Sequence, residues 1–197
     1  METKHTASQV DWDSITSEAM VRELLLRLGE DPEREGLLDT PKRVVKAFKE
    51  LTKGYKQNIG EILSRTFTSP YDEMIVVKDI PFVSLCEHHV LPFTGKVSVG
   101  YIPYGGKVIG LSKIPRLVGA IAAQLQIQER MTEEIAHALF DHPVLRPKGV
   151  AVIVEGNHFC MMYRGVKSKG TMKTSCLLGA MIKNTDARTE FLSLIKD

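Results

Sequence analysis

The first third of the chain has apolar positions that repeat with the period of a helix. On the first predicted helix, over about 17–28, they form one face: Val21, Leu24, Leu25 and Leu28. Thr40 followed by Pro41 is typical of a helix start, because a hydroxyl can cap the helix and proline needs no N–H partner in the first turn. A second helix is therefore expected from Thr40 to about Thr52.

After residue 70 the pattern changes to alternating and continuous apolar runs, which are typical of strands. Strands are expected over 74–85, 96–102, 150–154 and about 172–181. The segment 158–165 is expected to pair with the third of these strands across Gly156 and Asn157. Further helices are expected over about 112–125, 132–140 and 186–195.

This order of elements predicts an α+β fold in which helices cover one face of an antiparallel sheet, preceded by an N-terminal helical segment. We expect a flexible N-terminal tail at 1–12, because an untethered polar terminus is usually mobile. The N-terminal helical segment is expected at 13–70 and the α+β domain at 71–197.

Composition narrows the classes of function. The 197 residues are 43% hydrophobic and 25% charged, as in an ordinary globular domain. No stretch approaches the ~20 consecutive apolar residues that span a bilayer, and the first residues lack the apolar run of a secretory signal. A cytoplasmic protein without membrane association is therefore expected. The 26 basic and 24 acidic residues leave a formal charge of +2, which does not favour nucleic-acid binding.

The cysteines and histidines indicate metal chemistry. Three cysteines are an odd number, so a disulfide framework is not indicated and the thiols remain available to a metal. Cys86 and His89 are three residues apart in a predicted loop, a spacing at which both can bind one zinc ion. Cys160 could complete the site from across the sheet, on the same side of an extended segment as His158. Two thiolates and one imidazole leave a position for water, which favours hydrolysis.

Plainer interpretations of these residues stay open. Cys86 can be a small buried apolar residue, and His89 a satisfied polar one. Cys176 can be a core cysteine or a fourth ligand that closes the site. His88 and His158 can carry protons, since imidazole titrates near neutrality. Either can instead support the site from outside or simply be a surface residue. Two further histidines are expected to be solvated: His137 and His142.

Five segments together resemble the signature of the GTP cyclohydrolase I family. They are GEDPEREGLLDTPKRV, SLCEHHVLPFTGKV, VIGLSKIPRLV, QIQERMTEEI and HFCMMYRGV, and the resemblance extends from about Gly29 to the C-terminus. It implies a T-fold (tunnelling fold), usually assembled as a homodecamer with active sites between subunits. It also implies zinc-dependent hydrolysis of GTP to 7,8-dihydroneopterin triphosphate with release of formate, the first step towards folate or tetrahydrobiopterin.

The resemblance also implies a role for individual residues. The zinc ligands would be Cys86, His89 and Cys160. The catalytic residues would be His88, His158 and Ser112, the serine assisting the later ribose rearrangement. The residues that hold guanine would be Gln128 and Glu129, and a carboxylate can accept both N–H groups of the guanine edge. The triphosphate contacts would be Lys113, Arg116, Arg164 and, from a neighbouring subunit, Arg43 and Lys46. Without the resemblance, each charge would be interpreted as an ordinary solvated one.

Other functions stay open beside this one. A related T-fold nitrile reductase acting on a deazaguanine would use a nucleophilic cysteine and a nicotinamide, which the CEHH and HFC segments do not favour. A non-enzymatic protein in which zinc links an oligomer would need four ligands, Cys176 included. A zinc-finger nucleic-acid binder is disfavoured, because the ligands lie far apart in the sequence and the charge is nearly balanced.

Overall fold

The computed structural model describes residues 14–196, and the chain divides after Glu50 into two compact units. The tail expected at 1–12 lies outside the described residues. The segment 51–70, which the sequence places in the N-terminal helical part, belongs to the second unit. No helix in the described part of the chain is both long and apolar enough to cross a bilayer.

Both N-terminal helices form where the sequence predicts them. α1 (Ser17–Arg27) is capped by Thr16, whose hydroxyl oxygen accepts a hydrogen bond from the N–H of Ala19 at 3.2 Å. α2 (Thr40–Leu51) begins at the expected residue. There the Thr40 hydroxyl donates to the Gly36 carbonyl at 3.4 Å, so it satisfies a carbonyl that precedes the helix.

The second unit contains a five-stranded sheet, a two-stranded ribbon and helices. Its strands are β1 (Thr66–Thr68), β2 (Ile75–Cys86), β3 (Pro92–Ile102), β4 (Lys107–Ile109), β5 (Leu125–Gln126), β6 (Gly149–His158) and β7 (Met172–Gly179). Its helices are η2 (Lys53–Lys56, a 3-10 helix), α3 (Ile59–Ile62), α4 (Lys113–Ala122), α5 (Gln128–Phe140), α6 (Phe159–Met162), α7 (Ala180–Lys183) and α8 (Thr185–Leu194). This content is α+β, as the order of the predicted elements indicates.

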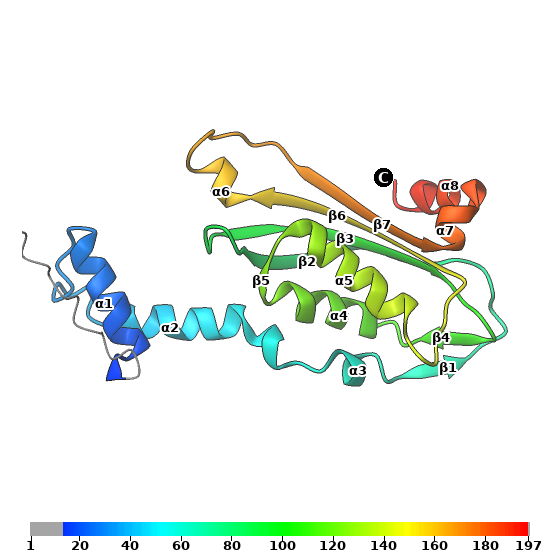
Figure 1. The fold of residues 1–197 in the computed structure, drawn as a ribbon, viewed down its shortest axis with the longest axis horizontal. Helices are drawn as coiled ribbons and strands as arrows, with labels where there is room; N and C mark the ends of the chain where they lie inside the picture. The colour runs from blue at the N-terminus through cyan, green and yellow to red at the C-terminus, as the bar shows by residue number, and fades with distance from the viewer. Residues whose placement is uncertain (1–13, 197) are drawn as a thin grey trace, which may run out of the picture. The chain divides into compact units, whose positions relative to one another are not determined.

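The main sheet has the strand order β5-β2-β3-β6-β7 (Figure 1). β2, β3, β6 and β7 are antiparallel neighbours, whereas β5 runs parallel to the end of β2, with Cys86 beside Gln126. The expectation of a purely antiparallel sheet is therefore wrong at this edge. β5 follows the helix α4, and a helical crossover allows the chain to re-enter a sheet in the parallel direction.

One face of the sheet carries α4 and α5 (Figure 1). Alternate residues of β6 point to this face and are fully buried: Val150, Val152 and Val154. Leu117 of α4 and Ile135 of α5 are fully buried in the same core. The apolar faces that predict these two helices are therefore the faces that pack on the sheet.

The opposite face is covered at one end by α8, so the expectation that helices cover only one face is wrong (Figure 1). Phe191 of α8 is fully buried in a second core with Ala151 of β6. Gly100 of β3 provides the space, because a Cβ at that position would lie 2.6 Å from Phe191 Cδ2. The continuous apolar run of β6 reflects this burial on both faces.

The segment that follows β6 is the helix α6 and not the expected partner strand. A hairpin across Gly156 and Asn157 would end β6 there, but both residues stay in the sheet opposite Gly95 and Thr94 of β3. β6 pairs instead with β7, the strand predicted over about 172–181. Cys160 therefore lies on a short helix and not on an extended segment.

Replacing Phe191 by alanine tests the second core. We expect Phe191→Ala to lower the free energy of unfolding by ~3–5 kcal/mol, because it leaves a cavity beside Gly100. Glu190→Ala, at an exposed position of the same helix, is the matched control and should change it by less than ~0.5 kcal/mol. Denaturant unfolding of both variants measures the difference. Equal stabilities would contradict the packing of α8 on the sheet.

Candidate functional site

The candidate site lies at one end of the main sheet, where one strand ends in a cysteine and another in a histidine. β3 lies between β2 and β6, and its first residues pair with both strands, Pro92 with Leu85 and Phe93 with His158. Cys86 ends β2 and His158 ends β6. These two residues therefore lie at the same end of the sheet, although they are far apart in the sequence.

α6 adds Cys160 to this end of the sheet. The Sγ atoms of Cys86 and Cys160 and a ring nitrogen of His158 all lie within 4.8 Å of one another. Zinc–ligand bonds of ~2.0–2.3 Å place tetrahedral ligand atoms ~3.5–3.8 Å apart, so the cluster has the dimensions of a metal site. Thiolate and imidazole are also the ligands that zinc prefers. The residues present therefore fit a zinc ion.

Burial controls the protonation of this cluster. Burial, and then the neighbouring Cys86, raise the pKa of the Cys160 thiol. Burial also lowers the pKa of His158, and the Glu129 carboxylate opposes that shift. The imidazole is thus held neutral, with a lone pair available to a metal or a proton. A cation beside the Cys160 thiol would favour its ionisation, and a bound metal would supply it.

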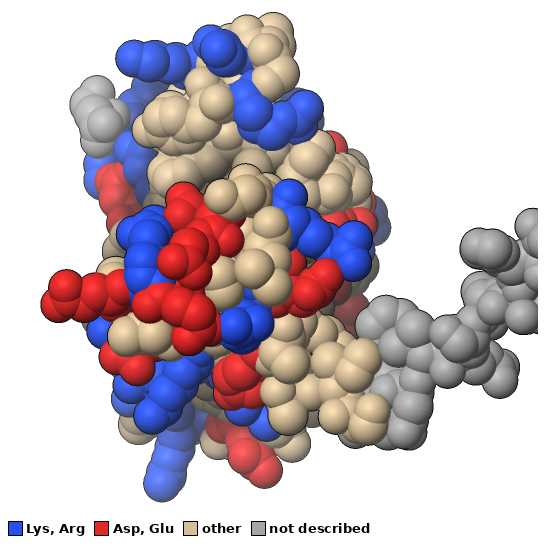
Figure 2. Space-filling view, turned by 90° about the vertical axis from the view of Figure 1, so that its left-hand side faces the viewer, with Lys and Arg blue, Asp and Glu red and all other residues tan. Residues whose placement is uncertain are grey.

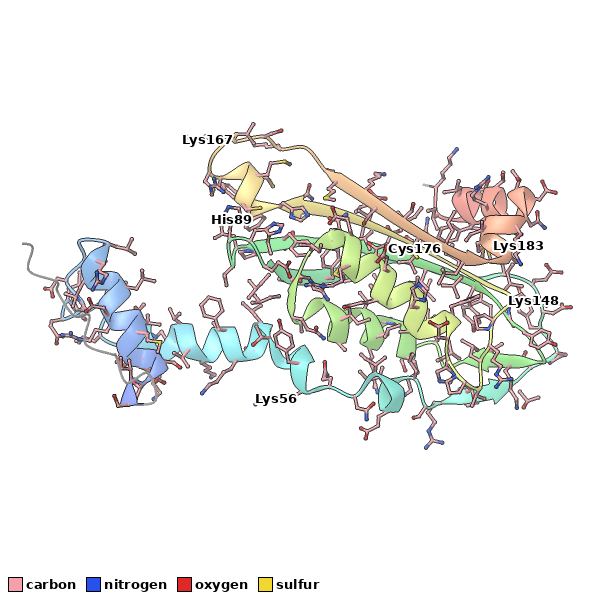
Figure 3. All side chains as sticks on the ribbon, in the orientation of Figure 1. Lys56, His89, Lys148, Lys167, Cys176 and Lys183 are labelled. Carbon is pink, nitrogen blue, oxygen red and sulfur yellow. The ribbon has the colours of Figure 1, made fainter. Side chains whose placement is uncertain are left out.

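Cys176 lies away from this cluster. It pairs with Val152, six residues before His158 in β6, so a rise of ~3.3 Å per residue places it ~20 Å from that end of the strand. Figure 3 labels Cys176 along β7, away from His89. Cys176 packs against the main hydrophobic core. The structure therefore places it in the core, the plainer of the two interpretations.

The two histidines expected to be solvated differ from each other. His137 is exposed and pairs with Asp141 at 2.9 Å. His142, in contrast, is 8% exposed, and its Nδ1 accepts hydrogen bonds from the N–H groups of Val144 and Leu145 at 3.3 and 3.0 Å. The expectation for His142 is wrong because the imidazole satisfies backbone groups of the loop before β6.

The loop between β2 and β3 carries His88 and His89, both exposed. Backbone hydrogen bonds join Cys86 N–H to the Leu91 carbonyl at 2.8 Å and Val90 N–H to the Cys86 carbonyl at 2.7 Å, which makes the loop tight. His88 Nδ1 lies 3.8 Å from Cys86 Sγ. His89 is outside the three-residue cluster.

The His89 imidazole instead contacts the loop that follows α6. Its Nε2 lies 2.6 Å from Arg164 Nη1. Arg164 is the first of three basic residues in the segment 164–169, with Lys167 and Lys169, and the segment contains no acidic residue. Figure 3 labels His89 and Lys167 at the same end of the sheet, and Lys148 and Lys183 at the other.

His158 is held between an aromatic ring and a buried amide. Its imidazole stacks on Phe93, with ring centroids 4.5 Å apart and an interplanar angle of 5°. Its Nε2 lies 2.9 Å from Gln128 Oε1. α5 begins at Gln128, one turn earlier than the sequence indicates, so Gln128 lies in its first turn with its side chain towards the sheet. Glu129, the next residue, is exposed.

Arg130 anchors the loop that carries the metal-ligand candidates, and no pattern in the sequence indicates this role. Its Nη2 donates to the Glu87 carboxylate at 2.6 Å and to the Leu125 carbonyl at 2.8 Å, and its Nε donates to Gln126 Oε1 at 3.0 Å. Gln126 is held in turn by the Glu134 carboxylate at 2.7 Å. Glu87 lies between Cys86 and His88, so these bonds join the loop to β5 and α5.

Comparisons with known proteins decide which family this site belongs to. The family model described as GTP cyclohydrolase I matches residues 17–196. The chain belongs to the GTP cyclohydrolase I family. It is 56% identical over 180 residues to the GTP cyclohydrolase 1 of Campylobacter concisus, covering 90% of this chain and 93% of that protein. It is 51% identical over 180 residues to the GTP cyclohydrolase 1 of Methylococcus capsulatus, covering 90% of this chain and 96% of that protein.

The site residues that the GTP cyclohydrolase I resemblance implies do not all lie close together in one chain. Ser112 and Lys113 line a cavity of about 970 Å³ together with Val77 of β2. Val77 is nine residues from Cys86 on the same strand, which corresponds to ~30 Å. Arg116 is exposed near the start of α4, on the same helix as Lys113.

Two further family positions, Arg43 and Lys46, belong to the first unit. Arg43 pairs with Asp39, with Nη2 and Oδ2 3.1 Å apart, and Lys46 is exposed. Both residues therefore lie outside the unit that carries the metal cluster.

Basic side chains gather at the end of the sheet that carries the cluster. The loop from α6 to β7 is the highest part of the ribbon in Figure 1, and the top of the face in Figure 2 carries Lys and Arg with almost no Asp or Glu. This agrees with the composition of the segment 164–169. An anionic ligand at the cluster would therefore meet a favourable local field.

Removing the guanidinium anchor tests its role in the GTP cyclohydrolase I site. We expect Arg130→Met to speed metal release from the protein roughly 5- to 30-fold, because Glu87 and the loop lose a charge-assisted hydrogen bond worth ~1–2 kcal/mol. Arg146→Met is the control, since Arg146 donates to the Pro143 carbonyl in the loop at the other end of β6. Transfer of the metal to a chromogenic chelator gives both rates, and equal rates in the two variants would contradict the anchoring role.

Proposed function

We propose that this chain hydrolyses GTP to 7,8-dihydroneopterin triphosphate and formate in a zinc-dependent reaction, the first step of pterin biosynthesis. The observation that carries the proposal is the cluster of Cys86, Cys160 and His158 within 4.8 Å, in a chain that belongs to the GTP cyclohydrolase I family. The match to the two named GTP cyclohydrolase 1 proteins covers nearly their whole length.

The proposed zinc ligands are Cys86, Cys160 and His89. His89 follows Cys86 within one tight turn, in which its N–H donates to the Cys86 carbonyl at 3.3 Å. Zinc bound by these residues would supply Lewis acidity, which makes hydrolysis feasible at neutral pH. Three protein ligands leave a coordination position for the reaction, as catalytic zinc sites do.

The histidines would move the protons of this reaction. Opening the imidazole ring of guanine requires a proton on the departing ring nitrogen, and His158 is a half-buried imidazole beside the two thiols. His88 is exposed in the same loop as the ligands, where it can assist the second hydrolysis that releases formate. Ser112 would assist the ribose rearrangement from its position at the start of α4.

Guanine would be selected by Glu129. Its carboxylate is exposed in the first turn of α5 and acts electrostatically on His158, so it lies beside the cluster. A carboxylate can accept hydrogen bonds from the ring N–H and the amino group of guanine together. Adenine lacks this paired edge, so a bound adenine would cover the carboxylate without satisfying it, at a cost of ~1–3 kcal/mol or more.

The triphosphate contacts require more than one copy of the chain. Arg164 contacts His89 at the cluster, whereas Ser112 and Lys113 line the cavity beside Val77, which is ~30 Å from Cys86 along β2. One site can contain both groups only if a second copy contributes one of them. We propose a homo-oligomer with sites between subunits, in which Arg116, Arg43 and Lys46 add to the phosphate contacts.

A homodecamer with the T-fold would meet this requirement. Among the described residues, β7 has a strand neighbour on one side only, so its outer edge is available to a strand of another copy. The proposed place of action is the cytoplasm, and the proposed partners are GTP and further copies of the chain.

Variants of the proposed ligands separate metal binding from proton transfer. Cys160→Ser and His89→Ala should lose zinc, whereas His158→Ala should keep it and lose ring opening by ~10²–10⁴-fold. The exposed His137→Ala is the control and should match the wild type. Zinc per chain is measured by mass spectrometry after dialysis against metal-free buffer. Zinc loss in His158→Ala with zinc retained in His89→Ala would move the ligand role to His158.

The reaction itself is tested by incubating the zinc-loaded protein with GTP and, in parallel, with ATP. Formate and pterin should form in equal amounts from GTP alone. Glu129→Gln should raise KM for GTP roughly 5- to 150-fold, the equivalent of ~1–3 kcal/mol. Glu133→Gln, exposed one turn later on α5, is the control. Zinc-loaded protein that releases no formate would contradict the proposed function.

A further inference from the structure

The carboxamide of Gln128 is buried beside His158 and is fully engaged within the chain. Gln128 is 1% exposed. Its Nε2 lies 3.1 Å from each of three acceptors: the Val154 carbonyl, the Met172 carbonyl and Thr174 Oγ1. Its Oε1 lies 2.9 Å from His158 Nε2. The amide therefore joins β6, β7 and the imidazole.

The chemistry of these partners fixes which way the amide points. A backbone carbonyl oxygen can only accept hydrogen bonds, so the amide atom that faces Val154 and Met172 must be the NH2 group. A rotated amide would place its oxygen against both carbonyls. The oxygen of Gln128 must therefore face His158, and an amide oxygen can only accept. His158 Nε2 must then carry the hydrogen.

Packing holds both side chains in this arrangement. A Cβ at Gly156 would lie 2.2 Å from Gln128 Oε1, so the strand approaches the amide as closely as glycine allows. The Thr132 hydroxyl donates to the backbone carbonyl of Gln128 at 2.6 Å, and Phe93 stacks on the imidazole at 4.5 Å. Turning the amide would lose its bonds to the Val154 and Met172 carbonyls, and flipping the imidazole would take Nε2 away from Gln128 Oε1.

We propose that Gln128 is a positioning residue that holds the His158 ring in one tautomer, with the hydrogen on Nε2 and the free lone pair on Nδ1. Nε2 then donates to the amide oxygen, and Nδ1 is the ring nitrogen left to the site. The role of this arrangement in ring opening rests on the proposed function, whereas the tautomer itself does not.

The proposal gives Gln128 a different task from the one expected from the family resemblance, which assigns it to guanine. The side-chain amide has its donors and its acceptor oxygen engaged by Val154, Met172, Thr174 and His158. The exposed Glu129 beside it remains the side chain that can reach a base. Gln128 thus faces inward and positions His158, whereas Glu129 faces outward and can bind the base.

Nuclear magnetic resonance of the full-length protein tests the tautomer without substrate. Histidine labelled with 15N and 13C in the ring distinguishes Nε2 from Nδ1, and the signals missing from His158→Ala assign the residue. We expect a protonated, pyrrole-type Nε2 for His158 in both zinc-loaded and chelator-treated protein. A pyridine-type Nε2 in the wild type would overturn the proposal. Because no GTP is present, this result is independent of the proposed reaction.

Substitutions then test the action of Gln128. Gln128→Met removes the acceptor at similar size and should give a mixture of the two His158 tautomers. Thr174→Val removes one acceptor of the amide and a contact with the Thr132 hydroxyl, but it leaves Gln128 Oε1 in place and should keep the Nε2–H form. Gln128→Met should also lower kcat roughly 10- to 100-fold with zinc retained.

The double variant Gln128→Met/His158→Ala shows whether the two residues act as one. It should be no slower than His158→Ala alone, because the amide acts through the imidazole. The proposal would be overturned if the losses of kcat from the two substitutions multiply in the double variant. It would also be overturned if a folded Gln128→Met variant keeps the wild-type tautomer of His158. If circular dichroism shows that Gln128→Met does not fold, the nuclear magnetic resonance spectrum of the wild type still tests the His158 tautomer.

Discussion

The candidate site depends on the register of β3 between β2 and β6. Phe93 opposite His158 and Pro92 opposite Leu85 place the ends of two strands side by side, and only then does α6 bring Cys160 to Cys86. A slip of one residue would turn each side chain to the other face of the sheet. The register is specified by burial on both faces, because Val152 and Val154 belong to one core and Ala151 to the other. The metal chemistry is therefore positioned by hydrophobic packing far from the metal ligands.

Polar contacts complete the alignment that packing begins. Gln128 crosses from α5 to the carbonyls of β6 and β7, and Arg130, two residues later, reaches Glu87 in the ligand loop. The first turn of α5 thus controls both sides of the cluster, the imidazole through an amide and the loop through a guanidinium. Each partner of the buried amide is itself fixed in a strand, so these hydrogen bonds lose little conformational freedom when they form.

The sequence predicted the helical and strand segments well, because most have one buried face and a clear period. It failed where a contact between distant segments decided the outcome. α6 reads as a strand by composition, but β6 already has partners on both sides in β3 and β7. Cys86 and His158 stood out as chemical residue types. Arg130 looks like an ordinary helix residue until its partners are known, and Gln128 was singled out only by the family resemblance, for contact with guanine and not for its buried contacts. The buried His142 was missed for the same reason, since the backbone N–H groups that donate to it lie in a loop.

The dimensions of the sheet support the proposal that the site is shared between copies. The metal cluster lies at one end of β2, and Val77, which lines the cavity with Ser112 and Lys113, lies near the other end, ~30 Å along the strand. A nucleoside triphosphate is too short to bridge this length, so its base and its phosphates cannot reach both groups of one copy. An adjacent copy, paired along the open edge of β7, could bring its own Ser112 end to the neighbour's cluster. The proposed assembly thus rests on the length of the strands as much as on the chemistry at their ends.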